Sequence, residues 1–227
     1  MSISNYGELK TAVANWMRRS DLTDRIPEFI ASGLQRTNND LLLRNGIPDQ
    51  EQVSIATTVA NQPSLVWPSD FGALRWIKRD YSDSADTIPL RPMGYDEIVE
   101  TYGTDTGAPE AYTAQDASFY FGPIPDGAYT IRVGYIKRYA TFTADVDTNY
   151  LLQNGSNILL WATLMEANVF MGDDGRAATL FVPAYQGALE GLRLMARRAR
   201  HARPQMQMVD AAILDLSTAG SDIVRGY

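Results

Sequence analysis

The chain has 227 residues, 45% of them hydrophobic, with no cysteine and a formal net charge of −7. This length and hydrophobic share are sufficient for a substantial core. The absence of cysteine excludes disulfides, thiolate metal sites and cysteine nucleophiles. The first residues lack the basic and then apolar run of a signal peptide, and no stretch of about 18 apolar residues predicts a membrane span.

The negative charge is concentrated in the middle of the chain. The net charge is +1 over residues 1–46, −8 over 47–147, +2 over 148–203 and −2 over the remaining residues. Attraction to phosphates requires a concentrated basic surface. The chain as a whole is therefore not expected to bind nucleic acid.

Residues 1–46 carry two helical patterns. Asn5 and Glu8 have the spacing of a capping box, and the apolar residues that follow predict a helix from about Tyr6 to Arg18. A second helix is predicted to begin near Arg25 and to end before Gly46. These residues predict the first half of a helical bundle.

From residue 47 to 147 the hydrophobic period changes to two, which predicts strands. A short helix is expected from Gly94 to Thr101. The sequence Pro125-Asp126-Gly127 is a strong turn signal and predicts a hairpin between the last two strands. The expected strands are Val53–Thr57, 64–67, 73–78, Ile88–Arg91, Ala111–Thr113, Ser118–Phe121 and Tyr129–Tyr135.

Residues 148–203 carry the two longest helical patterns, joined by a turn at Gly172–Gly175. Asn157 or Ser156 is expected to cap the first of these helices. Pro183 is expected to kink the second; the alternative places it near the first turn, with Thr179 or Asp174 as the cap. One apolar face is predicted for each helix. The residues are Ile158, Trp161, Ala162, Met165 and Val169 in the first, and Phe181, Tyr185, Ala188, Leu192 and Met195 in the second.

Together these patterns predict an α+β protein. Residues 1–46 and 148–203 are expected to form an antiparallel helical bundle, and 47–147 an inserted antiparallel β-sheet or sandwich. Residues 204–227 lack an apolar face of their own and predict an extended C-terminal arm. In this arm Ile213, Leu214 and Leu216 need a surface that covers them.

Catalytic and metal-binding patterns are weak, and no cofactor or metal is expected. The single histidine, His201, lies among arginines, with no acidic residue nearby in sequence to orient it. The acidic pairs Asp96-Glu97, Asp173-Asp174 and Asp145 with Asp147 lie at predicted turns or helix starts, where carboxylates cap free N–H groups. The alternative is a glycan hydrolase that uses paired carboxylates of the β segment.

The aromatic run Phe119, Tyr120 and Phe121 allows two interpretations. It could form a stacking platform for a carbohydrate or a base. Strand alternation places Phe119 and Phe121 on one face and Tyr120 on the other, which favours core packing.

The strongest functional signal is an arginine cluster at the end of the last helix. It consists of Arg193, Arg197, Arg198, Arg200 and Arg203. Such a cluster is typical of a solvated helix end, but it also suits contact with DNA or with another protein. A ring of copies would multiply the local charge.

Several segments, taken in order, resemble the head-to-tail adaptor (gatekeeper, or tail tubular protein A-like) family of short-tailed bacteriophages. They are NYGELKTAVANWMRRSDLTDRIPEFI, LVWPSDFGALRWI, FYFGPIPDGAYTIRVGYIKRY and YLLQN…ILLWATLMEANVFMGDD with the basic helix that follows. The resemblance covers most of residues 5–201. Gly33, Thr37 and Asn39 depart from the pattern in the second helix.

The resemblance implies a structural virion protein rather than an enzyme. It implies a ring of twelve copies, assembled in the host cytoplasm, that joins the portal protein to the tail (nozzle) protein around the DNA exit channel. The arm with Ile213, Leu214 and Leu216 would dock onto the portal. Genomic DNA would pass through the channel without sequence-specific contacts, and no membrane is involved. A nucleic-acid-binding module that uses the arginine cluster remains the second alternative.

Overall fold

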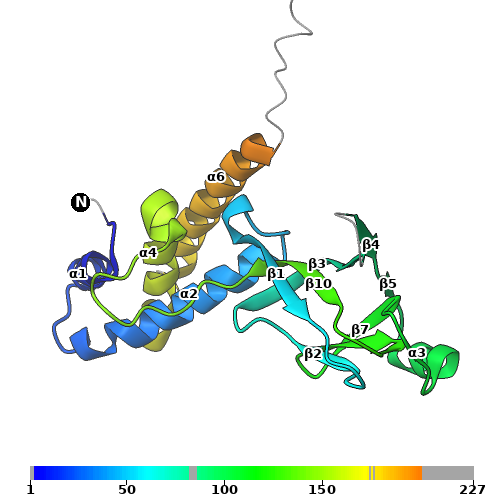
Figure 1. Ribbon diagram of the computed structural model, residues 1–227. Coiled ribbons are helices and arrows are strands. Elements are labelled where there is room, and N and C mark those ends of the chain that lie inside the picture. The colour runs from blue at the N-terminus through cyan, green and yellow to red at the C-terminus, as the bar shows by residue number, and fades with distance from the viewer. Residues whose placement is uncertain (1–2, 82–85, 174, 176, 201–227) are drawn as a thin grey trace, which may run out of the picture.

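A computed structural model describes residues 3–81, 86–173, 175 and 177–200. The long helices lie on one side of the molecule and the strands on the other, with α3 at the far end of the strands (Figure 1). The predicted α+β class is confirmed. The arm predicted for residues 204–227 lies outside the described residues, and the division of the chain at residues 47, 148 and 204 stays a prediction.

The helices follow the predicted order along the chain. A 3₁₀ turn precedes α2 and another precedes the first strand, and a π-helical segment precedes α6. The elements are α1 (Tyr6–Met17), η1 (Thr23–Arg25), α2 (Ile26–Leu42), η2 (Pro48–Gln50), α3 (Tyr95–Tyr102), α4 (Tyr150–Phe170), η3 (Ala177–Phe181) and α6 (Val182–Arg200).

The start of α1 is capped by side chains and by a distant loop. As predicted, Asn5 is the cap, because its Oδ1 accepts a hydrogen bond from the Glu8 backbone N–H at 2.9 Å. The carboxylate of Glu8 accepts from the backbone N–H of Ser4 at 2.7 Å, and these bonds lower the pKa of Glu8. Carbonyl oxygens of Asp145 and Asp147 accept from two further N–H groups of the first turn. All of these donors would otherwise lack intrahelical partners.

Helix α4 begins earlier than the sequence predicts. Asn149 caps it, accepting a hydrogen bond from the Leu152 N–H at 2.9 Å, so the expectation of a cap at Ser156 or Asn157 is wrong. The helix is kinked at Gly155, whose φ of −155° and ψ of 41° are not helical. The apolar residues Leu151 and Leu152, in the turn before this glycine, are buried. Leu151 and Leu152 therefore form an additional buried turn at the N-terminal end of α4.

Pro183 occupies the second position of α6, directly after the π-helical segment. The sequence predicted a kink inside a longer helix. A proline lacks the N–H that an interior helical position donates, but a first-turn position has no intrahelical acceptor for that group. The structure therefore favours the alternative that Pro183 belongs to a first turn.

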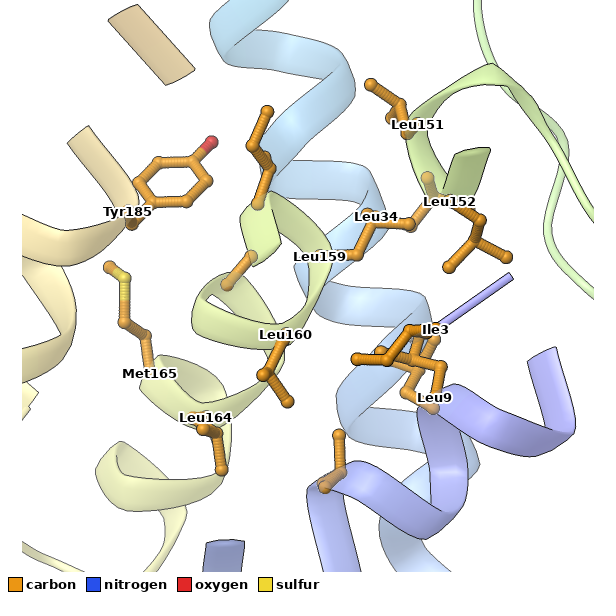
Figure 2. Packing of buried hydrophobic residues seen from close by; sticks show 14 of the residues in the cluster. Ile3, Leu9, Leu34, Leu151, Leu152, Leu159, Leu160, Leu164, Met165 and Tyr185 are labelled. Atoms are coloured by element: carbon orange, nitrogen blue, oxygen red, sulfur yellow. The ribbon is translucent and has the colours of Figure 1, made fainter. Parts of the chain in front are cut away.

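The long helices enclose one hydrophobic cluster. Leu9 of α1, Leu34 of α2 and Leu159 of α4 are 0–1% exposed, and Figure 2 shows them beside Leu160 and Ile3. Tyr185 and Met165 lie where α6 approaches α4 (Figure 2). Helix α4 contacts α1, α2 and α6, so it is the central helix of this cluster.

The predicted apolar faces of α4 and α6 are correct except at their ends. Most of the named residues are buried, but Val169 is 56% exposed and Met195 is 65% exposed. Trp161 is partly buried, with its ring stacked on Phe181 and meeting Trp16 edge-on. Met195 is exposed because the helix turns Leu192 and Ala196 inward instead.

The strands form two four-stranded sheets and one two-stranded pair. The sheet orders are β1-β10-β3-β4 and β2-β8-β7-β5, and β6 pairs with β9. Pairing is antiparallel except between β5 and β7 and between β6 and β9. The bounds are β1 (Glu51–Thr57), β2 (Ser64–Val66), β3 (Phe71–Asp80), β4 (Thr87–Pro89), β5 (Arg91–Pro92), β6 (Thr106–Gly107), β7 (Ala111–Gln115), β8 (Ser118–Gly122), β9 (Ile124–Pro125) and β10 (Thr130–Lys137).

The hairpin predicted between residues 118–121 and 129–135 is wrong. β8 pairs with β2 and β7, whereas β10 pairs with β1 and β3 in the other sheet. The segment around Pro125-Asp126-Gly127 carries the chain from one sheet to the other. The predicted strand Ile88–Arg91 is also divided between the sheets, because β4 pairs with β3 and β5 with β7.

A second hydrophobic cluster lies between the two sheets. Phe119 of β8 is 0% exposed and is close to the rings of Trp67, Phe71 and Tyr112. The other sheet contributes buried residues from β3 and β10, among them Ile77, Ile131 and Val133. The two faces pack as the layers of a small sandwich.

Polar side chains join the helices to the end of β10. The buried side chain of Asn38 donates to the Tyr139 carbonyl at 2.9 Å and accepts from the Tyr139 N–H at 3.0 Å. Gln50 donates to the Lys137 carbonyl at 3.1 Å, and the Tyr139 hydroxyl donates to Asp49 at 2.8 Å. Burial and this carboxylate raise the pKa of Tyr139. The strand that leaves the β part is thus fixed to α2 and η2.

Candidate interaction surfaces

The arginine cluster lies at the C-terminal end of α6. Arg193 is half-buried and pairs with Glu190, one turn earlier, at 2.6 Å. Arg197 and Arg198 are exposed, and Arg200 is the last residue of the helix. The structure therefore places these four arginines along the last two turns of α6, while Arg203 and His201 lie outside the described residues.

Helix α6 is anchored before it reaches these arginines. The buried Tyr185 hydroxyl donates to Asp40 of α2 at 2.6 Å. Burial raises the pKa of Tyr185, and the Asp40 carboxylate raises it further. Leu189 and Leu192 continue the buried face along the helix. The basic end therefore projects from a helix that is fixed against the hydrophobic cluster.

Two apolar side chains lie among the exposed arginines. Leu194 is 50% exposed and Met195 is 65% exposed. Residues three and four apart share a helix face, so Leu194 neighbours both Arg197 and Arg198. The sequence analysis predicted the charge here but assigned Met195 to the apolar face, which is wrong. The exposure of Leu194 and Met195 follows from the inward orientation of Leu192 and Ala196.

The three residues assigned to the arm's contact, Ile213, Leu214 and Leu216, lie outside the described residues. The structure neither brings them together nor separates them. The assignment of these residues to portal binding stays a prediction.

The outer face of the β1-β10-β3 sheet carries exposed apolar side chains beside charged ones. Val53 and Ile55 of β1 are 54% and 58% exposed, and Arg132 of β10, in register with Ile55, pairs with Asp80 of β3. The Trp76 ring covers Gly134, where a Cβ would lie 2.2 Å from Cε2 of that ring, and Lys78 Nζ lies 5.1 Å from the ring centre. A shallow groove of about 420 Å³ follows these strands, lined by Glu51, Gln52, Val53, Arg75, Trp76, Gly134 and Tyr135.

The opposite end of the β part carries an acidic surface. Residues 92–131 contain seven acidic residues and no lysine, arginine or histidine, and all seven acidic residues are exposed. Three of them, Asp96, Glu97 and Glu100, belong to α3. Tyr95 and Val99 on the same helix are 47% and 49% exposed.

Two residues of the acidic pairs, Glu97 and Asp147, accept hydrogen bonds from backbone N–H groups, as predicted. Glu97 accepts from the Gly94 N–H at 3.3 Å at the start of α3. Asp147 accepts from the Ala144 and Thr143 N–H groups and from the Thr143 hydroxyl, and these bonds lower its pKa. Asp145 pairs with Lys10, whereas Asp174 lies outside the described residues.

The aromatic run of β8 packs mainly in the core, which favours the core interpretation over a stacking platform. Within residues 3–81, 86–173, 175 and 177–200, no group of three or more His, Cys, Asp or Glu side chains is placed to hold a metal ion. Phe119 and Phe121 are buried core residues, while Tyr120 meets Tyr95 edge-on at the surface. No helix in the described part of the chain is long and apolar enough to cross a membrane.

Comparison with known proteins places these surfaces in context. A family model described as SU10 adaptor protein matches residues 4–208 of the chain. No curated protein matches the sequence. The match covers the helices, both sheets and the arginine cluster.

Proposed function

Because the chain belongs to the SU10 adaptor protein family, we propose that it is a ring-forming head-to-tail adaptor that joins the portal to the tail. The family is one of structural adaptor proteins of bacteriophages. The observation that carries the proposal is the match over residues 4–208, nearly the whole chain. In this proposal, twelve copies surround the channel through which DNA leaves the virion.

The arrangement of surfaces supports a connecting role. The basic end of α6 and the acidic end of the β part lie far apart in Figure 1, and the outer face of the β1-β10-β3 sheet exposes the apolar side chains of Val53 and Ile55. A protein that binds neighbours, a portal and a tail needs several separate surfaces. We assign the portal to the arm after α6 and the next tail component to the exposed sheet face.

Electron microscopy of the protein with the portal of the same virion tests the ring. The expected result is a closed ring on the portal, with density for the arm on the portal surface. Absence of any ring, at every ratio of the two proteins, would contradict the proposal.

Truncation after Arg203 tests the arm. Its expected effect is loss of portal attachment with unchanged helicity and stability, because the removed residues lack an apolar face of their own. Aspartate at Ile213, Leu214 and Leu216 should have the same effect, whereas alanine at Gln205 and Gln207 is the matched control. Strong hydrogen-exchange protection of 211–216 in the free protein would contradict the arm's role.

Substitution on the sheet face tests the contact with the tail. Val53→Asp with Ile55→Asp places two charges on an exposed strand and should leave the fold intact while recruitment of the tail component is lost. Ser32→Asp with Gln35→Asp, which adds the same charge at two exposed positions of α2, is the control. Normal recruitment by the double variant would mean that another surface binds the tail.

A further inference from the structure

The last turns of α6 and helix α3 present opposite charges beside exposed apolar side chains. On α6, exposed Leu194 shares a face with Arg197 and Arg198. On α3, exposed Val99 lies four residues after exposed Tyr95, and Asp96 and Glu100 form the neighbouring row. Each surface therefore combines exposed apolar and charged side chains, and the charges of the two surfaces are of opposite sign.

We propose that the Arg197–Arg198 surface of α6 binds the α3 surface of a second copy of this chain. The inference rests on the ring of the proposed function and names the surfaces that join its subunits. Within one copy the two surfaces lie far apart, so they can meet only between copies (Figure 1). A contact between two different surfaces of identical chains repeats head to tail and forms a ring when its rotation closes.

The charge distribution favours another copy of the chain over DNA as the partner of this surface. Arg197 and Arg198 are exposed, Arg193 is half-buried and paired with Glu190, and the chain as a whole carries −7. A protein surface that binds nucleic acid gains affinity from many contacts with phosphates. Exposed apolar side chains such as Leu194 and Met195 do not contribute to such contacts. By contrast, apolar side chains bounded by complementary charges are typical of protein interfaces.

Charge reversal on either surface should weaken self-association. Arg197→Glu with Arg198→Glu, and separately Asp96→Lys with Glu100→Lys, should each reduce the association constant about tenfold or more at low salt. The measurement is sedimentation equilibrium of the full chain. Circular dichroism should show that both variants keep the wild-type helicity, since all four side chains are exposed.

Mixing the two variants provides the decisive result. The variant with Arg197→Glu and Arg198→Glu keeps an acidic α3, which complements the basic α6 of the variant with Asp96→Lys and Glu100→Lys. The acidic α6 of the former likewise complements the basic α3 of the latter. An equimolar mixture should therefore recover wild-type association through alternating copies, as should one chain with all four changes. Arg18→Glu with Arg44→Glu, an equal change of charge at two exposed positions next to α1 and α2, should have no effect on association.

Several outcomes would overturn the inference. They are wild-type association in either double variant, no recovery on mixing, or a wild-type chain that stays monomeric at every concentration. Loss of DNA retention by the arginine variant with unchanged association would assign the surface to DNA. If that variant forms normal rings on portals, only the inference fails; if the wild-type chain forms none, the proposed function itself fails.

Discussion

Gly33 of α2 lies directly against the backbone of Thr163 of α4. A Cβ on Gly33 would lie 2.8 Å from the backbone nitrogen of Thr163 and 3.1 Å from the carbonyl carbon of Ala162. The small residue permits the helices to approach backbone to backbone. The hydroxyls of Thr37 and Thr163 bond back to carbonyls of their own helices, at 2.8 and 2.7 Å, so no buried donor is left without a partner there.

Gly33→Ala should therefore destabilise the protein. The methyl group would meet backbone atoms that cannot move independently, and such overpacking typically costs about 1–3 kcal/mol. The measurement is the free energy of unfolding in urea.

Gly187→Ala is the matched control for this change. Gly187 is exposed on α6 with no atom within 4 Å of an added Cβ, so alanine should stabilise the helix by about 0.5–1 kcal/mol. Equal effects of the two substitutions would show that the close approach does not limit the size of residue 33.

Asn38→Ala should cost about 2–4 kcal/mol. The substitution removes two hydrogen bonds and leaves the buried N–H and C=O groups of Tyr139 without their partner. Asn39→Ala is the control, because that side chain is exposed, accepts a hydrogen bond from Arg138 and should change stability by about 0.5 kcal/mol or less. A small effect of Asn38→Ala would mean that water replaces its amide at the junction.

Stability should fall in alkaline solution. Burial, assisted by Asp70, raises the pKa of Tyr135 to about 12, and burial also raises the pKa of Tyr139 and of Tyr185. The folded state thus holds these protons more tightly than the unfolded chain does. The stabilisation that these tyrosines contribute is fully present below pH about 10, the ordinary pKa of a tyrosine, and is lost as the pH rises toward 12 and beyond.

Urea midpoints measured across this pH range check the prediction. The variant with Tyr139→Phe and Tyr185→Phe should lose stability less steeply above pH about 10, because two of the three phenols no longer ionise. Tyr81→Phe, at an exposed position, is the control for the loss of a hydroxyl. A slope equal to that of the wild type in the double variant would contradict the assignment.

Trp161→Ala should cost about 2–4 kcal/mol, near the lower end of the range for buried aromatic residues, because its ring is only partly buried. The lost contacts are the stack on Phe181 and the edge contact with Trp16. Val169→Ala should cost much less, since that side chain is 56% exposed. Equal losses in the two variants, measured by reversible denaturation, would place Trp161 at the surface.

Local patterns in the sequence predicted the helices but not the pairing of strands. The spacing of apolar residues such as Leu9 and Leu34 within each helix indicates which face is buried, because the helical period depends only on residues close in sequence. By contrast, the turn at Pro125-Asp126-Gly127 indicates only a change of direction, and the partners of β8 and β10 are set by β1, β2 and β3 far along the chain. The interpretation as a hairpin failed for this reason.

The functional surfaces were predicted in part. The arginine cluster follows from composition, and its position on α6 from helical spacing. The exposed apolar side chains beside it, and those of Val53 and Ile55, depend on which face each element turns to its neighbours. Gly33 and Thr37, which departed from the family pattern, fit the close crossing of α2 and α4, and only the structure shows that contact.

The central position of α4 has a consequence for synthesis on the ribosome. Helix α2 ends at Leu42 and α4 at Phe170, so 128 further residues must be translated before the surface that covers α1 and α2 is complete. At about 5–20 residues per second this takes roughly 6–25 s. Leu9, Ile30 and Leu34 remain without their main cover during that interval. The nascent chain therefore exposes apolar side chains that chaperones can bind until its second half emerges.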